Sequence, residues 1–486
     1  TSREKNTVAR FRARAIAVRR MGCLLVALVP ACLLLVPTGA LAPAPRTLVQ
    51  PRVVAGEWSF PSDGTWASRR TEFMRDYWQR KPLLIRGMLS AADADIITPD
   101  ELAGIACEEG VEARIICEQG LADGPPWALV HGPFGEEDFS KLPEDGWTLL
   151  VNEVNLVVPD VANLIQRRFA DVPNWRADDV MVSYACKNGG IGAHTDNYDV
   201  FLLQGSGERR WEIEETPRAA ADELLVPRLA VRVLQQFTPD RSWVLQAGDC
   251  LYIPPRFPHR GTSLHDKCMT YSMGYRAPKA ADLVRDFAEL AADGCADDDF
   301  FADPRVSEGE PLAEAAGELT TEALDTLEAL LRERLERALG NRAELRAWLC
   351  AQVTKRRRAA LEFEGDHAQL DGSLLVDKLA RAPQRDGSVE VPAELRGLQL
   401  WRAEGVTFAF ARAAALHGGE AALFVDGERF NLAGDAEPAV ERLAETLCAQ
   451  SPLGPSKLAL AGCPAFTAAL RSLALSGKLY FAPVEA

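Results

Sequence analysis

The sequence has 486 residues with a formal net charge of −16, and 47% of its residues are hydrophobic. A chain of this length is too long to fold around a single hydrophobic core, so a single small domain is excluded and two or three domains are expected. The acidic balance argues against direct nucleic-acid binding and favours a basic protein partner. The eleven cysteines are scattered, odd in number and without a CxxC pair, which argues against a disulfide framework.

Residues 1–57 are predicted to form a targeting leader and linker. Residues 1–20 carry seven Lys or Arg against one acidic residue, and a short apolar run broken by Pro30 follows. The run is shorter than the roughly 20 residues that cross a bilayer, so no stable membrane span is expected. Basic, apolar and then small residues are typical of a signal-type leader. With its Ala/Pro-rich continuation it resembles the two-part leader of plastid proteins, which favours a plastid; a mitochondrion, the cytosol and secretion are the alternatives, and Met21 is a possible start.

Residues 58–178 contain several helix and strand patterns. Apolar residues at helical spacing indicate helices, and short runs rich in β-branched and aromatic residues indicate strands. On this basis helices are expected at 71–80, 100–106 and 161–169, and strands at 81–85, 113–117, 147–150 and 153–157.

Two distant segments, 180–211 and 248–259, contain the residues that point to a metal site. His194 and Asp196 are two residues apart, so on an extended strand their side chains lie on the same side. His259 follows a short apolar strand and supplies a second imidazole. Two histidines and one carboxylate on one face of a metal leave positions open for an oxidant and a cosubstrate. The sequence therefore predicts a mononuclear iron site.

Arg209 is the candidate for anchoring a carboxylate beside this site. It lies past the turn at 204–207, and a hairpin there is expected to return the chain so that Arg209 lies on the strand beside the metal. Alternation along a strand lets only one of Arg209 and Arg210 face inward. A guanidinium can bind a carboxylate through two parallel hydrogen bonds.

The segments GGIGAHTDNYDVFLLQGSGERRW, LQAGDCLYIPPRFPHRGTSL and YSMGYRAP resemble the JmjC-domain ribosomal oxygenases. The resemblance covers roughly residues 60–486, and it is closest to the bacterial enzymes that hydroxylate an arginine of a large-subunit ribosomal protein. It implies a mixed α+β chain: a double-stranded β-helix (cupin, JmjC) catalytic domain at 58–278, a helical dimerisation region at 279–364 and a winged-helix-like domain at 365–486.

The resemblance also implies the roles of the site residues. Fe(II) is expected on His194, Asp196 and His259, with 2-oxoglutarate bound by Arg209 and with O2 as oxidant. The substrate pocket falls on Asp179, Met181 and Tyr198, where a carboxylate can pair with a guanidinium while the other two side chains enclose its aliphatic stem. Because the cofactor supplies the oxidising chemistry, no catalytic residue beyond the metal ligands is expected.

The chain after residue 278 is predicted to be mainly helical as far as 358. Helices are expected at 279–291, 320–340 and 341–358, with Thr320 or Thr321 capping the second. Leucines at 324, 327, 331 and 335 lie on one face of that helix and need a partner surface. The resemblance implies that these helices form a homodimer; packing on the catalytic domain is the alternative.

Residues 365–486 are predicted to mix strands and helices. Strands are expected at 398–402, 408–410, 422–425 and 478–483, and helices at 437–450 and 463–476. Asp426-Gly427 indicates a hairpin turn. The order fits a winged-helix type, and because the last helix lacks a basic stripe, protein docking is favoured over DNA binding.

Other substrates and another class of protein remain open from the sequence alone. The expected activity is hydroxylation of a ribosomal protein, at an arginine side chain, by an Fe(II)/2-oxoglutarate-dependent dioxygenase. A JmjC histidine hydroxylase or lysine demethylase would use the same iron site, because an acidic pocket does not separate arginine from methyl-lysine. A non-catalytic cupin scaffold is the alternative from another class, and the complete ligand set argues against it.

Overall fold

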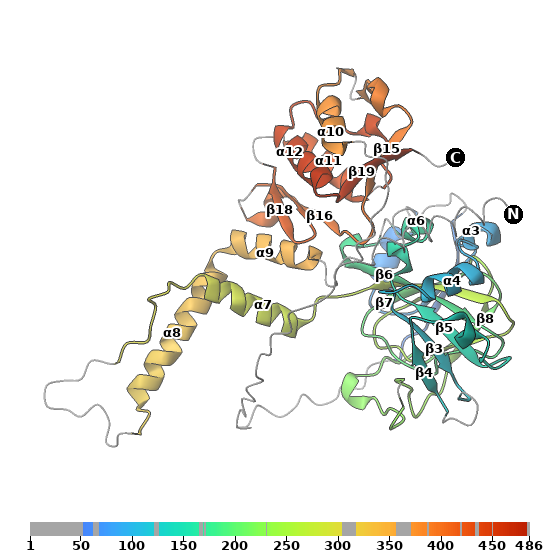
Figure 1. The fold of residues 1–486 in the computed structure, drawn as a ribbon. Coiled ribbons are helices and arrows are strands. Elements are labelled where there is room, and N and C mark those ends of the chain that lie inside the picture. The colour runs from blue at the N-terminus through green and yellow to red at the C-terminus, as the bar shows by residue number, and fades with distance from the viewer. Residues whose placement is uncertain are drawn as a thin grey trace. The chain divides into compact units, whose positions relative to one another are not determined.

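The computed structural model describes most of the chain, and its described residues divide into two compact units (Figure 1). The first unit contains the described residues up to 169 together with Ala177–Arg276, and the second contains Val172–Arg176 and the rest. The predicted leader as far as residue 51 and the predicted domain boundary at 364 lie outside the described residues. The described residues are 52–61, 68–120, 126–164, 169, 172–229, 231–303, 317–355, 371–385, 388–417, 420–432, 437–449 and 451–483.

Two sheets build the first unit. Among the described residues, the larger sheet has nine strands in the order β1 (Gly56–Ser59), β2 (Leu83–Arg86), β10 (Cys250–Ile253), β7 (Asp199–Gln204), β12 (Cys268–Tyr275), β6 (Ala177–Ala185), β5 (Trp147–Val151), β3 (Ala113–Cys117) and β4 (Ala128–His131). The smaller sheet has the order β11 (His259–Ser263), β8 (Arg209–Ile213) and β9 (Arg241–Leu245), with antiparallel pairing throughout.

The two sheets share one apolar core. The strands of the smaller sheet alternate buried and more exposed residues, as on β8, where Arg209, Trp211 and Ile213 are buried, whereas β7 and β10 of the larger sheet are buried throughout. Trp211 and Ile213 pack in one cluster with Leu202 and Leu251 of the larger sheet. Two sheets with a common interior, antiparallel except for the β1–β2 pair, form the double-stranded β-helix that the resemblance implies.

The turn at 204–207 does not form the predicted hairpin. The strand before it, β7, pairs with β10 and β12 of the larger sheet, whereas β8 after it pairs with β11 and β9 of the smaller one. Gly207 has φ +69°, and a Cβ there would lie 2.9 Å from the Cα of Cys268, so the crossing requires a glycine. The chain therefore changes sheets here, and Arg209 reaches the strand beside His259 by this route.

Most elements of residues 58–178 lie where the sequence predicts them, with one error. Residues 153–157 are not a strand: Val154–Leu156 forms a 3-10 turn, and Glu153 before it has a left-handed φ of 56°. The predicted helix at 161–169 begins earlier, as α6 (Pro159–Asn163), and its later part lies outside the described residues. The predicted helix at 100–106 is α4 (Pro99–Ala106), where Thr98 and Glu101 form a capping box.

The second unit begins with three helices. They are α7 (Ala280–Asp293), α8 (Thr321–Gly340) and α9 (Arg342–Thr354), and the side chain of Thr320 caps α8 by accepting a hydrogen bond from the backbone N–H of Ala323. The last two are separate helices, because Asn341 leaves helical geometry and caps α9. No helix in the described part of the chain is both long and apolar enough to cross a membrane.

The remainder of this unit mixes strands and helices around its own core. The strands β15 (Leu398–Arg402) and β19 (Leu479–Pro483) pair with each other, and β16 (Phe408–Ala411), β17 (Ala422–Val425) and β18 (Glu428–Asn431) form a second sheet. The β17–β18 hairpin turns at Asp426 and Gly427, both with positive φ, as predicted. The helices are α10 (Gly372–Ala380), α11 (Glu437–Ala449) and α12 (Pro464–Leu475). Assignment to the winged-helix type stays a prediction.

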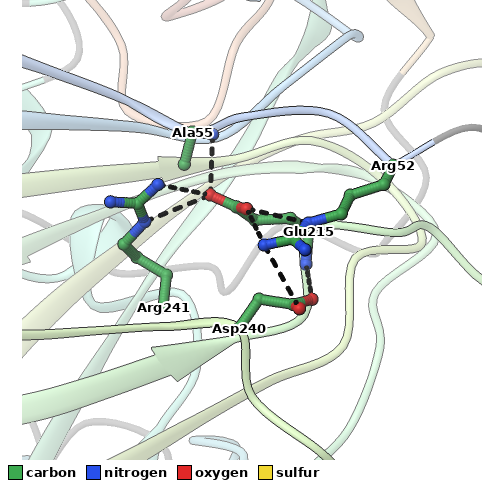
Figure 2. Close-up of polar contacts among 5 residues, drawn as sticks. All are labelled: Arg52, Ala55, Glu215, Asp240 and Arg241. Atoms are coloured by element: carbon green, nitrogen blue, oxygen red, sulfur yellow. Dashed lines mark hydrogen bonds and ion pairs between the residues drawn. The ribbon is translucent and has the colours of Figure 1, made fainter.

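A buried carboxylate anchors the first described residues to the smaller sheet. The side chain of Glu215 is 1% exposed and accepts hydrogen bonds from both Arg52 and Arg241, at 3.0 Å from each Nη2 atom (Figure 2). The backbone N–H of Ala55 donates to the same carboxylate at 3.0 Å, and Asp240 pairs with Arg52 at 3.4 Å. Burial raises the pKa of Glu215, but the Ala55 N–H and the two guanidinium groups lower it more, so the net pKa lies below its ordinary value.

Glu215→Gln is expected to lower the free energy of unfolding of the first unit by about 2 kcal/mol, because charge-assisted hydrogen bonds become neutral or are lost. A depressed carboxyl pKa stabilises the fold above its ordinary value and loses that effect as the pH falls through the folded-state pKa. The deficit should therefore be full at neutral pH and shrink below about pH 4. Urea denaturation at several pH values measures it.

Glu57→Gln is the matched control, because Glu57 pairs with Arg86 at 3.0 Å but its side chain is 50% exposed. A surface pair of this kind contributes about 1 kcal/mol or less. Equal effects of the two substitutions would contradict the role assigned to Glu215.

Candidate metal centre

The structure brings His194, Asp196 and His259 together. Their potential ligand atoms all lie within 4.8 Å of one another. The Nε2 atom of His259 is 3.6 Å from Asp196 Oδ2, and Nε2 of His194 is 4.0 Å from the same oxygen. No other group of three or more His, Cys, Asp or Glu residues in the described ranges meets this spacing. The two segments that the sequence singles out thus converge on one point.

Backbone pairing between the two histidines creates this convergence. The backbone N–H of each donates to the carbonyl of the other, at 3.0 Å and 2.9 Å, in an isolated antiparallel bridge. His259 is the first residue of β11, whereas His194 and Asp196 precede β7 outside any regular strand. The expectation that an extended strand carries both His194 and Asp196 is therefore wrong: one bridge holds the first histidine, and Asp196 lies in the turn beyond it.

Both imidazoles are oriented for metal binding. Nδ1 of His194 lies 3.0 Å from the carbonyl of Gly192, and Nδ1 of His259 lies 2.9 Å from that of Phe257. Each Nδ1 therefore carries the proton and donates it, which leaves the lone pair on Nε2 for a metal. Burial and then the neighbouring His194 lower the pKa of His259 to about 4, so this imidazole is neutral at physiological pH.

Arg209 lies in the interior on the strand next to His259. It is on β8, opposite Ser263 of β11, and is 5% exposed, whereas its neighbour Arg210 is exposed. Its Nη1 is 3.5 Å from Ser183 Oγ and its Nε is 3.5 Å from Cys268 Sγ, both long contacts. Nη2 has no hydrogen-bond partner among the described residues. A buried guanidinium with an unsatisfied N–H fits a carboxylate ligand, as 2-oxoglutarate presents.

Trp211 is a further inward-facing residue of β8 that the sequence alone does not single out. It is two residues after Arg209 on the same inward face, and its buried indole N–H has no hydrogen-bond partner among the described residues. Gly261 lies opposite it on β11, where a Cβ would be 2.7 Å from the Trp211 ring. Strand alternation from Arg209 is the sequence signal that predicts this position.

The three predicted substrate residues lie near this interior, on or next to the larger sheet. Asp179 and Met181 are half-buried on β6, on the same strand face as Ser183, whose hydroxyl contacts Arg209 of the other sheet. Tyr198 precedes β7; its Cε2 and Asp179 Oδ1 lie 3.7 Å and 3.2 Å from the position that a Cβ on Gly274 would take. Burial, then the charges of Asp196 and Asp179, raise the pKa of Tyr198. Asp179 and Tyr198 therefore lie close together beside the metal centre.

Comparisons with known proteins agree with this site. Residues 164–283 match the JmjC domain family. The chain is 37% identical over 263 residues to the ribosomal protein uL16 3-hydroxylase of Escherichia coli, covering 54% of this chain and 66% of that relative. It is 34% identical over 269 residues to a probable ribosomal oxygenase of Haemophilus influenzae, covering 54% and 63%. The alignments thus span slightly less than two thirds of these relatives.

The solved structures extend the similarity over more of the chain. The ribosomal oxygenase YcfD from Escherichia coli, in complex with cobalt and 2-oxoglutarate, superposes with a TM-score of 0.59 at 27% identity, covering 85% of this chain and 98% of that one. A second structure of YcfD gives a TM-score of 0.62 over the same shares. The metal triad and the buried arginine thus lie within residues that match the JmjC domain, in a chain that is similar to ribosomal oxygenases.

Proposed function

We propose that this protein is an Fe(II)- and 2-oxoglutarate-dependent hydroxylase of a ribosomal protein. The observation that carries the proposal is the convergence of His194, Asp196 and His259, together with the buried Arg209, which lies on the strand paired with that of His259 and has an unsatisfied N–H. Two imidazoles and one carboxylate suit a non-haem Fe(II) that keeps open positions. The cobalt and 2-oxoglutarate in the similar YcfD structure support the same pair of groups.

Each residue of the site has a separate task. The two histidines and Asp196 would hold the iron, and Arg209 would anchor the remote carboxylate of 2-oxoglutarate. When bound, Fe(II) with 2-oxoglutarate and O2 supplies the oxidising power that puts one oxygen atom into a substrate C–H bond and the other into succinate, with loss of CO2. The protein contributes neutral imidazoles, a fixed cosubstrate and alignment of the target carbon.

We propose an arginine of the large-subunit ribosomal protein uL16 as the substrate residue. The named activity of the Escherichia coli relative supports uL16 as the substrate protein. The proximity of Asp179 and Tyr198 to each other and to Asp196 supports a cationic side chain. A carboxylate forms a two-pronged contact with a planar guanidinium, and an aromatic ring can cover its face. The net charge of −16 also favours a basic protein as partner.

Hydroxylation of defined peptides tests this proposal. The purified protein is incubated with Fe(II), 2-oxoglutarate and uL16 peptides that contain either the arginine or a lysine in its place. Mass spectrometry is expected to show the gain of one oxygen atom on the arginine peptide, together with succinate. Hydroxylation of a histidine, or loss of a methyl group from a lysine, would contradict the arginine assignment and would identify one of the alternative activities instead. Absence of 2-oxoglutarate turnover with any ribosomal peptide would overturn the enzyme assignment.

We also propose that α8 mediates a homodimer. None of its residues is buried within the chain, and Leu324, Leu327 and Leu331 are 49%, 42% and 63% exposed. These leucines recur on one helical face, and an apolar stripe of this kind is normally covered by another surface. A second copy presents the same stripe, so an isologous contact would cover both.

Leu327→Glu combined with Leu331→Glu is expected to convert the dimer into a monomer, because two buried charges would face each other in the contact. Sedimentation velocity at micromolar concentration measures the change. Glu333→Lys is the control, since Glu333 lies on the opposite face of α8 and its side chain is 68% exposed. A monomeric unmodified protein under these conditions would contradict the proposal.

A further inference from the structure

A buried carboxylate from a distant loop contacts the centre of the metal-ligand segment. Glu223 directly follows the short turn Ala220–Asp222 between β8 and β9, and its side chain is only 4% exposed. The hydroxyl of Thr195, between the two ligands His194 and Asp196, donates a hydrogen bond to Glu223 Oε1. Nη2 of Arg256 donates to the same oxygen at 2.7 Å. The carboxylate therefore joins the His194–Asp196 segment to the segment that leads into β11.

Arg256 holds the same turn through further contacts. Its backbone N–H donates to the carbonyl of Asp196 at 2.7 Å, and its Nη1 donates to Asn197 Oδ1 at 2.9 Å. Its Nε donates to the carbonyl of Arg218 at 2.8 Å, so this one side chain joins the turn at Asn197 to the loop that contains Arg218 and Glu223. The residue is three positions before His259, which makes it a direct link between the two parts of the metal centre.

The backbone of Arg256 adopts an unfavourable conformation, whose energetic cost its side-chain contacts offset. Its φ is +74°, in the left-handed region that residues other than glycine rarely occupy. Such a conformation costs of order 1 kcal/mol or more and persists only where surrounding contacts impose it. Here the hydrogen bonds to Glu223, Asn197 and Arg218 do so. The turn then delivers His259 opposite His194.

We propose that Glu223 and Arg256 are positioning residues of the metal centre, which hold Asp196 and His259 in ligand geometry before a metal binds. The proposal rests on the proposed function in that it requires a metal at the triad. Groups that orient metal ligands without touching the metal typically change metal affinity 10- to 100-fold when they are removed. Neither residue has a sequence signal of its own, because their partners are fixed only by the fold.

Arg232 offers a matched control. It also pairs with Glu223, at 2.9 Å through the other carboxylate oxygen, but its side chain is 70% exposed. No described contact links it to the ligand segment. Arg232→Gln therefore removes one cation that pairs with Glu223 and leaves the contacts to the segments of Asp196 and His259 in place.

Titration of the full-length protein with Co(II), followed by its visible absorption, tests the proposal. Arg256→Gln and Glu223→Gln should each raise the Co(II) dissociation constant about 10-fold or more, and the absorption bands should change as the ligand geometry loosens. Arg232→Gln should leave both within about twofold. Because Arg256 and Glu223 act as one pair, the double variant should lose little more than either single one. Arg256→Lys, which keeps the charge but not the fork, should recover part of the affinity.

Two outcomes would overturn the proposal in different ways. Unchanged Co(II) binding by Arg256→Gln and Glu223→Gln, with Asp196→Ala strongly impaired, would overturn this inference alone. Equal losses in all three charge variants, in proportion to equal drops in melting temperature, would show general stabilisation and also overturn it. Failure of the unmodified protein to bind Co(II) saturably would overturn the proposed function and this inference together.

Discussion

Asp196→Ala is expected to abolish substrate hydroxylation and to remove specific divalent-metal binding. Asp196 is the single carboxylate of the triad, with Oδ2 3.6 Å and 4.0 Å from the two imidazole Nε2 atoms. Alanine leaves two neutral imidazoles, which hold a divalent cation weakly without an anionic ligand. The loss of metal affinity should exceed the roughly 100-fold change that outer contacts cause. Co(II) titration and mass spectrometry of the peptide product measure the two effects.

Substitution of His194 by alanine should have the same consequence, because the remaining two ligands cannot define one face of the metal. His131→Ala is the control, since His131 is an exposed residue of β4 outside the triad. It should bind Co(II) and hydroxylate substrate at the unmodified rate. Undiminished hydroxylation by Asp196→Ala would refute the assignment of the site.

Arg209→Ala is expected to raise the KM for 2-oxoglutarate by about 30-fold or more, because truncating one partner of a buried charge pair costs about 2 kcal/mol or more. Arg209 is 5% exposed and has a buried N–H without a partner among the described residues. The guanidinium is therefore available to bind the cosubstrate carboxylate. Turnover at saturating 2-oxoglutarate should fall less than kcat/KM does. Succinate formation against 2-oxoglutarate concentration gives both constants.

Arg210→Ala is the matched control for this prediction. It removes an identical side chain one position along β8, but Arg210 points to the exposed face of the strand. Its KM for 2-oxoglutarate should stay within about twofold, as expected for a surface charge. An equal rise in KM for both variants would mean that Arg209 does not contact the cosubstrate.

The sequence predicts the chemistry of this site better than its local geometry. The three ligand residues and Arg209 are recognisable because few residue types suit iron and a carboxylate, and the motifs that contain them are specific. The supporting backbone is not recognisable in the same way. Whether β8 pairs with β7 or with β11 depends on contacts made by residues far away in the chain, so the turn at 204–207 is compatible with either a hairpin or a crossing.

Two other differences have local causes. In residues 153–157 the apolar side chains alternate as in a short strand, and a single Asn155 is too weak a turn signal to predict the 3-10 turn that starts after the left-handed Glu153. The role of Glu223 could not be predicted from the sequence for a different reason. It lies in an irregular loop between β8 and β9, and only the fold brings it against Thr195.

The anchoring of Arg52 by Glu215 would limit how far the predicted leader can be trimmed without loss of stability. If the proposed leader is cleaved, a cut before Arg52 keeps both cations and the Ala55 N–H on the buried carboxylate. A cut just beyond Arg52 would leave the carboxylate with Arg241 and would put a new terminus, with a charged amine, beside the smaller sheet. If a leader is removed, we therefore expect the cut to lie upstream of Arg52, where these contacts are kept.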